Sequence, residues 1–329
     1  MHKELELWQF VAERLYRDES VMLLVVAESS GSSPGRQGYK MAVGADGELV
    51  GSIGGGVMEV RLVDLSRQIL SDPTESNSAF RAPRSALSEQ VHRANSPRAS
   101  GMICSGKQTV IFKLLTSSDA RTVDSIIDSL VARRPDRLTV TALEFKIEAH
   151  EGGSQNDFTF DKLSDSDFRF TERLGFKNDL YIIGGGHCAL ALSELMSKMD
   201  FHISLFDDRP DLNTIDKNRF AHRIEIVDSY ETIADEVPAG ANSYVVVMTL
   251  GYASDERVIR ALLDKEFKYF GVLGSSAKMS VMLRKLLKEG FPAKKLDRIR
   301  TPIGLPINSH TPDEIAVSIA AEIISVKNS

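Results

Sequence analysis

The stretch Leu180-Tyr181-Ile182-Ile183-Gly184-Gly185-Gly186-His187-Cys188-Ala189 decides the fold of the carboxy-terminal half of this chain. Its apolar start predicts a buried strand, and the amphipathic run 190–199 that follows predicts a helix. Gly184, Gly186 and Ala189 match the Gly-x-Gly-x-x-Gly/Ala turn of dinucleotide-type folds, in which a glycine-rich turn joins a strand to a helix. The sequence therefore predicts a Rossmann-like domain.

Strand and helix patterns alternate from residue 179 onward, which predicts a parallel sheet with helices on both faces. The predicted strands are 180–183, 202–206, 224–227, 244–248 and 269–273. Asp207 ends the second of these strands, where a carboxylate could accept the ribose hydroxyls of a dinucleotide. The same turn serves packing alone in many domains, so the pattern predicts the fold and leaves a bound NAD(P) or other nucleotide open.

The amino-terminal half predicts a second α/β domain, which gives domains at residues 1–175 and 176–329. Helical spacing of Leu5, Trp8, Ala12 and Leu15 predicts a first helix. Further strands are predicted at 21–26, 40–43, 48–50, 109–115 and 139–145, and helices at 57–70 and 119–132. The polar, proline-containing residues 71–100 predict an extended or mobile excursion, and residues 149–177 predict the junction between the domains.

A second glycine-rich loop, Gly51-Ser52-Ile53-Gly54-Gly55-Gly56, precedes the helix predicted at 57–70. Glycine lets backbone N–H groups turn toward a ligand, and a helix N-terminus adds partial positive charge. Gly54, Gly55 and Gly56 are therefore candidates for binding an anion such as phosphate.

Composition excludes several classes of protein. A chain of 329 residues with 42% hydrophobic content can bury a substantial core, whereas a net charge of -6 argues against a nucleic-acid surface. The apolar run 21–27 is too short to cross a bilayer, and the first residues lack a signal-peptide pattern, so we expect a cytoplasmic protein without membrane contact. Cys104 and Cys188 cannot form a disulfide framework, and zinc-ligand spacings do not occur.

Several motifs in order along the chain are similar to those of the XdhC/CoxI family, whose members are accessory proteins of xanthine dehydrogenase and related molybdenum hydroxylases. The motifs in the amino-terminal half are 31-GSSPGR-36, 51-GSIGGGVME-59 and 101-GMICSG-106. Those that resemble the family's Rossmann domain are 184-GGGH-187, 207-DDRP-210, 273-LGSSAK-278 and 302-PIGL-305.

The resemblance implies a protein that binds molybdenum cofactor, supports its sulfuration and delivers it to a xanthine dehydrogenase-type hydroxylase. Such a protein is more a cofactor-binding and insertion factor than a catalyst. Its implied partners are that hydroxylase and a cysteine desulfurase as sulfur donor, and we expect a homodimer. The alternative is an NAD(P)-binding oxidoreductase, although the sequence offers no obvious proton donor beyond His187.

The family motif favours Cys104 as a functional thiol and as a molybdenum ligand, because thiolates suit soft metals; the alternative is a small buried side chain. Two interpretations stay open for Glu59, which could contact the pterin or complement the helix dipole. Arg36 could pair with a phosphate or be a solvated cation. His187 could contact a ligand or cap the loop. The remaining candidate cofactor contacts are Ser33, Ser275 and Lys278.

The sequence departs from the family pattern at two positions. Many relatives have glycine where this chain has Ser105, and histidine where it has Leu250. The second replacement puts one contact with cofactor or partner in doubt.

Overall fold

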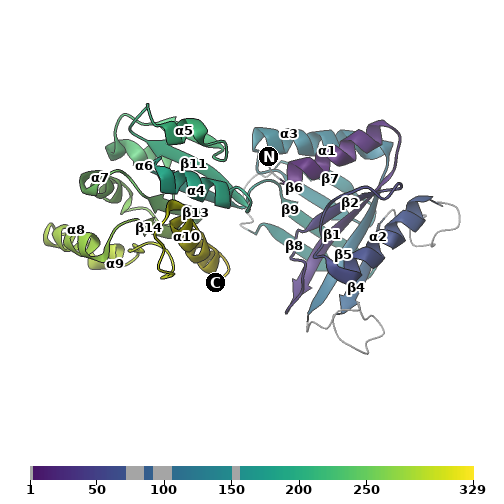
Figure 1. Cartoon of the computed structure of the whole chain (residues 1–329). Helices are drawn as coiled ribbons and strands as arrows, with labels where there is room; N and C mark the ends of the chain where they lie inside the picture. The colour runs from purple at the N-terminus through teal and green to yellow at the C-terminus, as the bar shows by residue number, and fades with distance from the viewer. Residues whose placement is uncertain (1–2, 72–84, 92–105, 150–155) are drawn as a thin grey trace. The chain divides into compact units, whose positions relative to one another are not determined.

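The computed structural model describes residues 3–71, 85–91, 106–149 and 156–329. The chain divides into two compact units, Met1–Gly175 and Phe176–Ser329 (Figure 1). No helix in the described part of the chain combines the length and the apolar character that a bilayer crossing requires.

The first unit is built on a five-stranded antiparallel sheet with the order β3-β2-β1-β5-β4. Its strands are β1 (Val21–Ser30), β2 (Lys40–Gly44), β3 (Leu49–Gly51), β4 (Ser85–Val91) and β5 (Lys107–Leu115). Successive side chains of β1 point to opposite faces, and both faces are covered, so the run 21–27 is buried throughout. This explains why the central strand of an antiparallel sheet has a continuous apolar sequence.

Helices and a second sheet cover the two faces of the first sheet. Helix α2 (Gly56–Ser71) packs on one face through Met58 and Leu62. Helices α1 (Lys3–Tyr16) and α3 (Ala120–Ala132), the latter preceded by the short helix η2 (Ser117–Asp119), contribute to the core on the other face, and Figure 1 shows α2 on the opposite side of the sheet from them.

The second sheet of this unit has the order β7-β6-β9-β8, all antiparallel. Its strands are β6 (Arg137–Thr141), β7 (Phe145–Glu148), β8 (Phe158–Lys162) and β9 (Phe168–Arg173). The single strand predicted at 139–145 is wrong, because Thr141 accepts hydrogen bonds from two backbone N–H groups of a turn that separates β6 from β7. The stretch 149–177, predicted as the junction with only brief strand candidates, contains β8 and β9, and the division between the two units falls near its end.

The excursion predicted at 71–100 contains β4, whose residues 85–91 pair with β5 at the edge of the first sheet. Residues 72–84 and 92–100 lie outside the described residues.

A buried ionic group joins three elements of the first unit. The ammonium of Lys40 in β2 lies 3.0 Å from Glu4 Oε1 in α1 and 2.6 Å from Glu172 Oε2 in β9. The other Glu4 oxygen accepts a hydrogen bond from the N–H of Gly175 at 3.1 Å. Burial opposes the lysine charge, but the two carboxylates raise the pKa of Lys40 overall. The ammonium of Lys40 is therefore held within the fold by two carboxylates.

The second unit contains a five-stranded parallel sheet with the order β12-β11-β10-β13-β14. The strands are β10 (Asn178–Ile183), β11 (Phe201–Asp207), β12 (Arg223–Ile226), β13 (Gly240–Val247) and β14 (Phe267–Val272). From β10 the chain continues to β11 and β12 on one side of β10, and it then crosses to β13 and β14 on the other side of β10. This order places the topological switch point between the carboxyl ends of β10 and β13.

Helices pack on both faces of this sheet, which confirms the predicted Rossmann-like architecture. The helices α4 (His187–Met196) and α10 (Pro312–Lys327) contribute to one core, whereas α7 (Tyr252–Leu262) and α8 (Ser276–Lys288) contribute to the core on the opposite face. The shorter helices are α5 (Asn213–Lys217), η3 (Tyr230–Thr232), α6 (Ile233–Glu236) and α9 (Ala293–Leu296).

Candidate functional site

The glycine turn after β10 forms one side of the carboxyl edge of the parallel sheet. Gly184 has a φ of 109°, and a Cβ on it would lie 2.3 Å from the carbonyl oxygen of Met248, which follows β13. Helix α5, which follows β11, holds Gly185 in place: the hydroxyl of Thr214 donates a 2.5 Å hydrogen bond to the Gly185 carbonyl. The turn is therefore fixed against both neighbouring strand ends.

Asp207 ends β11 at the same edge, and its carboxylate is fully buried. It accepts a 2.6 Å hydrogen bond from the N–H of Gly185, and three more from the backbone and guanidinium of Arg209. Burial acts to raise the pKa of Asp207, but these donors outweigh it and hold the pKa below its usual range. Asp207 thus fixes the glycine turn, and its oxygens are occupied by groups of the protein where the sequence suggested ribose.

A second buried carboxylate fixes the loop after β13. Asp255 in α7 accepts hydrogen bonds from the N–H and hydroxyl of Thr249, the latter at 2.6 Å. Its other oxygen lies 2.8 Å from the ammonium of Lys278. The hydroxyl of Ser275 caps α8 by accepting the N–H of Lys278. The candidates Ser275 and Lys278 therefore lie at the expected edge, and both have partners within the protein.

Two glycines at this edge have neither a conformational nor a steric requirement for glycine. Gly186 and Gly251 are the N-cap residues of α4 and α7, and both have ordinary extended backbone. A Cβ added at either would have no heavy atom within 4 Å. The first-turn N–H groups of each helix lack intrahelical partners and supply partial positive charge. Beside these turns, His187 is exposed and Leu250 is 79% exposed.

The glycine loop of the first unit binds an anion that belongs to the protein. One carboxylate oxygen of Glu59, in the first turn of α2, accepts hydrogen bonds from the hydroxyl of Ser52 and from the N–H groups of Ile53 and Gly55. These bonds measure 2.7, 2.9 and 2.9 Å. The local interpretation of Glu59, as a partner of its own helix and loop, is therefore the one that the geometry supports.

The Gly-Ser-Ser-Pro-Gly turn packs directly against this loop through a buried amide. Gln108 in β5 accepts the hydroxyl hydrogen of Ser33 at 2.8 Å and donates to the carbonyl of Ile53 at 2.8 Å. A Cβ on Gly54, whose φ is 128°, would lie 2.4 Å from the backbone nitrogen of Gly35. Ser33, only 5% exposed, thus joins two motifs within the fold, and its hydroxyl donates to Gln108.

The remaining candidates of the first unit are Arg36, Gly56 and Cys104. Arg36 is exposed, and its one hydrogen bond among the described residues goes to the carbonyl of Gly31 at 3.5 Å. Gly56 begins α2 with a φ of 73°. Cys104 and Ser105 lie outside the described residues.

The other cysteine, Cys188, is partly buried against the core of the second unit, as its position inside the helix predicts. Burial raises the pKa of its thiol. Within residues 3–71, 85–91, 106–149 and 156–329, histidine, cysteine and carboxylate side chains do not gather in threes that could hold a metal ion.

Family models match both units of the chain. Residues 180–323 match the XdhC Rossmann domain, and residues 15–76 match the XdhC and CoxI family. The chain belongs to the XdhC and CoxI family. The predicted family, with its Rossmann domain in the carboxy-terminal half, is thereby confirmed.

The family relatives include longer proteins. The chain is 24% identical over 306 residues to uncharacterized protein YqeB of Escherichia coli K12, and 28% identical over 159 residues to a probable xanthine dehydrogenase component of Bacillus subtilis 168. The aligned parts are 92% and 48% of this chain, and 43% and 46% of the relatives. The chain thus spans less than half the length of these curated relatives.

The fold is shared with a solved structure described as a xanthine dehydrogenase from Bacillus halodurans. The TM-score is 0.72 at 22% identity, with 100% of this chain and 96% of that chain covered. At this identity the likeness establishes the fold of a family member.

Three residues that hold the glycine loops and the loop after β13 in place were not among the candidates predicted from the sequence: Arg209, Asp255 and Gln108. Arg209 belongs to a family motif, but its pairing with Asp207 depends on where the chain turns after β11. Asp255 and Gln108 look like ordinary polar positions of an amphipathic helix and a strand edge. Asp255 has a sequence signal, because it lies on the face of α7 that the apolar residues Val258, Ile259 and Leu262 mark as buried, whereas Gln108 lies just before the predicted strand 109–115.

Proposed function

We propose that this protein is an accessory factor of a xanthine dehydrogenase-type hydroxylase, and that molybdenum cofactor is its cargo. In this proposal it binds the cofactor, supports its sulfuration with a sulfur donor such as a cysteine desulfurase, and delivers it to the enzyme. Family membership and the names of two relatives support the accessory role. Self-association as a homodimer belongs to the same proposal.

The observation that carries the proposal is the pair of open glycine N-caps at the switch point. Gly186 and Gly251 start helices from neighbouring strands, and the space where their Cβ atoms would project has no protein atom within 4 Å. Backbone N–H groups and two helix dipoles suit a terminal phosphate, which the cofactor carries on its pterin. The site fits an anion without a basic side chain, because Arg209 and Lys278 are already paired.

The glycine loop of the first unit is a less suitable place for that phosphate. Glu59 already accepts hydrogen bonds from two of its N–H groups, and a phosphate there would meet a carboxylate. We therefore assign the phosphate to the second unit. Cys104 stays the proposed soft ligand of the metal, as the family motif implies. The thiol would supply a molybdenum ligand during exchange of the terminal oxo group.

The alternative function, an NAD(P)-binding oxidoreductase, has weaker support. It depended on Asp207 as acceptor of ribose hydroxyls, and that carboxylate is buried and bonded to Gly185 and Arg209. A ribose would have to displace an arginine that is paired to it through two N–H groups.

Retention of cofactor by glycine variants tests the assignment. Gly186→Val and Gly251→Val place methyl groups in the open space without backbone strain, so thermal stability should stay close to that of the wild type. After anaerobic incubation with molybdenum cofactor and gel filtration, we expect both variants to retain less than about a tenth of the wild-type pterin. Val281→Leu, remote from this edge, is the control and should retain the wild-type amount.

The same experiment with Cys104→Ala tests the thiol. We expect molybdenum and pterin near one per protein chain in the wild type, and a lower molybdenum content in the variant. A wild-type protein that retains no cofactor would refute the proposal and make NAD(P) binding the next measurement. A monomeric mass at full cofactor affinity would exclude the homodimer.

A further inference from the structure

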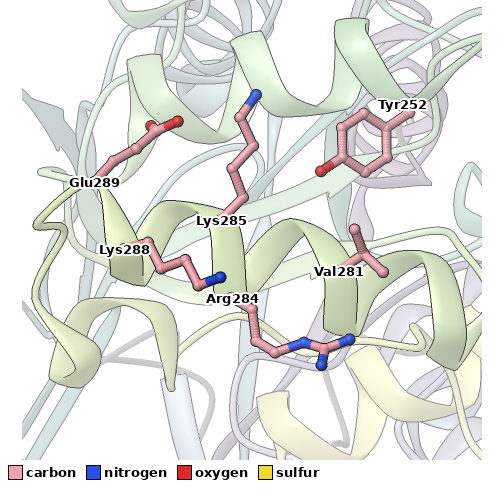
Figure 2. Close-up of a pocket in the computed structure, with 6 residues that line it drawn as sticks. All are labelled: Tyr252, Val281, Arg284, Lys285, Lys288 and Glu289. Atoms are coloured by element: carbon pink, nitrogen blue, oxygen red, sulfur yellow. The ribbon is translucent and has the colours of Figure 1, made fainter.

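A groove lies between α7 and α8, on residues that the candidate site does not use. Its volume is about 500 Å³, and it is lined by Tyr252 of α7 and by Val281, Arg284, Lys285, Lys288 and Glu289 of α8 and its C-cap. Figure 2 shows Lys285 and Glu289 reaching toward α7, and Tyr252 beside the two helices. Val281, Arg284 and Lys288 occupy successive turns of one face of α8.

The groove carries an excess of positive charge in a chain whose net charge is -6. The two carboxylates of this region, Glu256 and Glu289, pair with Arg260 and Lys285. Arg284 donates only to the backbone carbonyl of Ser280 at 3.0 Å, and Lys288 has no hydrogen-bond or ion-pair partner among the described residues. Helix α8 contains no carboxylate between residues 276 and 288. Two cations one helical turn apart are therefore left without counter-charges.

Apolar side chains lie among these cations. Val281 is 53% exposed and Leu287 is 45% exposed on α8. The helix dipole explains basic residues in the last turn, where Lys285 and Lys288 lie, but not the exposed aliphatic side chain of Val281 in the lining of the groove. A surface that combines unpaired cations with exposed aliphatic groups is typical of a protein interface.

The exposure of the lining residues indicates the size of the occupant. Lys285 is 49% exposed and Glu289 38% exposed, whereas a small-molecule pocket covers most of its ligand's surface. The space between two neighbouring surface helices accommodates a third helix, as in helix-in-groove recognition. The one-turn spacing of Arg284 and Lys288 matches carboxylates one turn apart on such a helix.

We propose that the α7–α8 groove docks an acidic helical segment of a partner protein, with carboxylates paired to Arg284 and Lys288 and an apolar side chain against Val281 and Tyr252. The proposal does not depend on the cargo of the switch-point edge. A membrane surface is disfavoured, because the main apolar side of α8, formed by Met279, Met282 and Leu286, is already buried in the core. Nucleic acid is disfavoured by the small number of uncompensated cations.

The probe for the test is a fluorescein-labelled helical peptide of about fourteen residues, or roughly four turns, with glutamates four positions apart beside a leucine. Fluorescence anisotropy with the full chain should give saturable binding that weakens as NaCl is raised. The variant Arg284→Glu/Lys288→Glu should bind about tenfold or more weakly, since two ion pairs become two repulsions. The charge-matched control Lys268→Glu/Lys294→Glu changes exposed lysines outside the groove and should bind as the wild type does.

The proposal also predicts dependence on the apolar anchor: Val281→Ser, an uncharged change at a position that is 53% exposed, should weaken peptide binding as well. Equal loss of binding in the two charge-reversal variants would overturn the proposal, as would the absence of saturable binding by the wild type. So would complete competition by inorganic phosphate at equal ionic strength, which indicates a small-anion site. Binding to phosphatidylserine vesicles that is lost with Arg284→Glu/Lys288→Glu while the peptide fails to bind would assign the face to membranes instead.

Discussion

The carboxylate of Asp207 has hydrogen bonds from four N–H groups of two residues, and this makes it the main determinant of the glycine turn. Its position was predictable, because the fingerprint places an acid at the end of the second strand. Its partner was not, because the approach of Arg209 depends on the path of the chain after β11. The same fingerprint residue can therefore fix the turn where the motif alone suggests a ligand contact.

Replacement of this carboxylate has a pH-dependent effect. Asp207→Asn should lower the free energy of unfolding by about 2 kcal/mol at pH 7, because it weakens charge-assisted bonds at a buried site. The folded-state pKa lies below the ordinary value of 3.8, so the contribution of the ionised form is complete above that value and is lost as the pH falls through the folded-state pKa. Urea unfolding followed by circular dichroism should show the difference at pH 7 and a smaller one at pH 3.

Asp208→Asn is the control for this variant, because that side chain is 32% exposed and lies 3.9 Å from Arg209. It should change stability little at either pH. A difference for Asp207→Asn that stays constant between pH 7 and pH 3 would contradict the role given to the charge.

A second prediction at the residue scale concerns the carboxylate of Glu59 in the first unit. Glu59→Ala removes the acceptor of three hydrogen bonds and should cost about 2 kcal/mol of stability. It also exposes the N–H groups of Ile53 and Gly55 to other anions, so inorganic phosphate should raise the melting temperature of the variant more than that of the wild type. Val60→Ala, 60% exposed on the same helix, is the control. An equal response to phosphate in all three proteins would mean that the carboxylate does not occupy an anion site.

At the scale of elements, strands with apolar runs were predictable, including the edge strands β3, β12 and β14, whereas β4, β8 and β9 were not predicted as separate strands. β1 and β10 are buried on both faces over their apolar runs, 21–27 and 180–183. β4 has the sequence SALSEQV, and most of its side chains are only partly buried, so backbone pairing with β5 holds it in place. β8 and β9 do alternate apolar and polar residues, and Phe168 and Phe170 of β9 are buried, but both strands are short and lie in a stretch rich in aspartate.

Helix α10 has a cap that the sequence predicts in full. The hydroxyl of Thr311 accepts the N–H of Glu314, and the Glu314 carboxylate accepts the N–H of Thr311. Thr311→Ala should therefore lower the free energy of unfolding by about 1 kcal/mol, which thermal denaturation would detect as a lower midpoint. Val317→Ala, 49% exposed on the same helix, should have little effect, and an equal loss in both variants would mean that the cap contributes nothing specific.

At the scale of the molecule, each unit has its own cores. The second unit buries separate apolar clusters on the two faces of its sheet, which begin in sequence at Tyr181 and Leu180 respectively. A protein of residues 176–329 should therefore fold alone, with cooperative thermal unfolding and helical circular dichroism. A gradual, non-cooperative transition would show that this unit requires the first one for its stability.

The contact of Glu4 with Lys40 and with the N–H of Gly175 determines when the first unit can be completed during synthesis. Helix α1 leaves the ribosome before β9 does, yet Gly175, whose N–H binds Glu4, and Glu172, which pairs with Lys40, lie on or after β9. At about 5–20 residues per second, the helix waits roughly 10 to 30 seconds before Glu172 and Gly175 are available. Over that interval the ionic group around Lys40 stays incomplete, so slow translation prolongs the time in which α1 is held only by the elements made before β9.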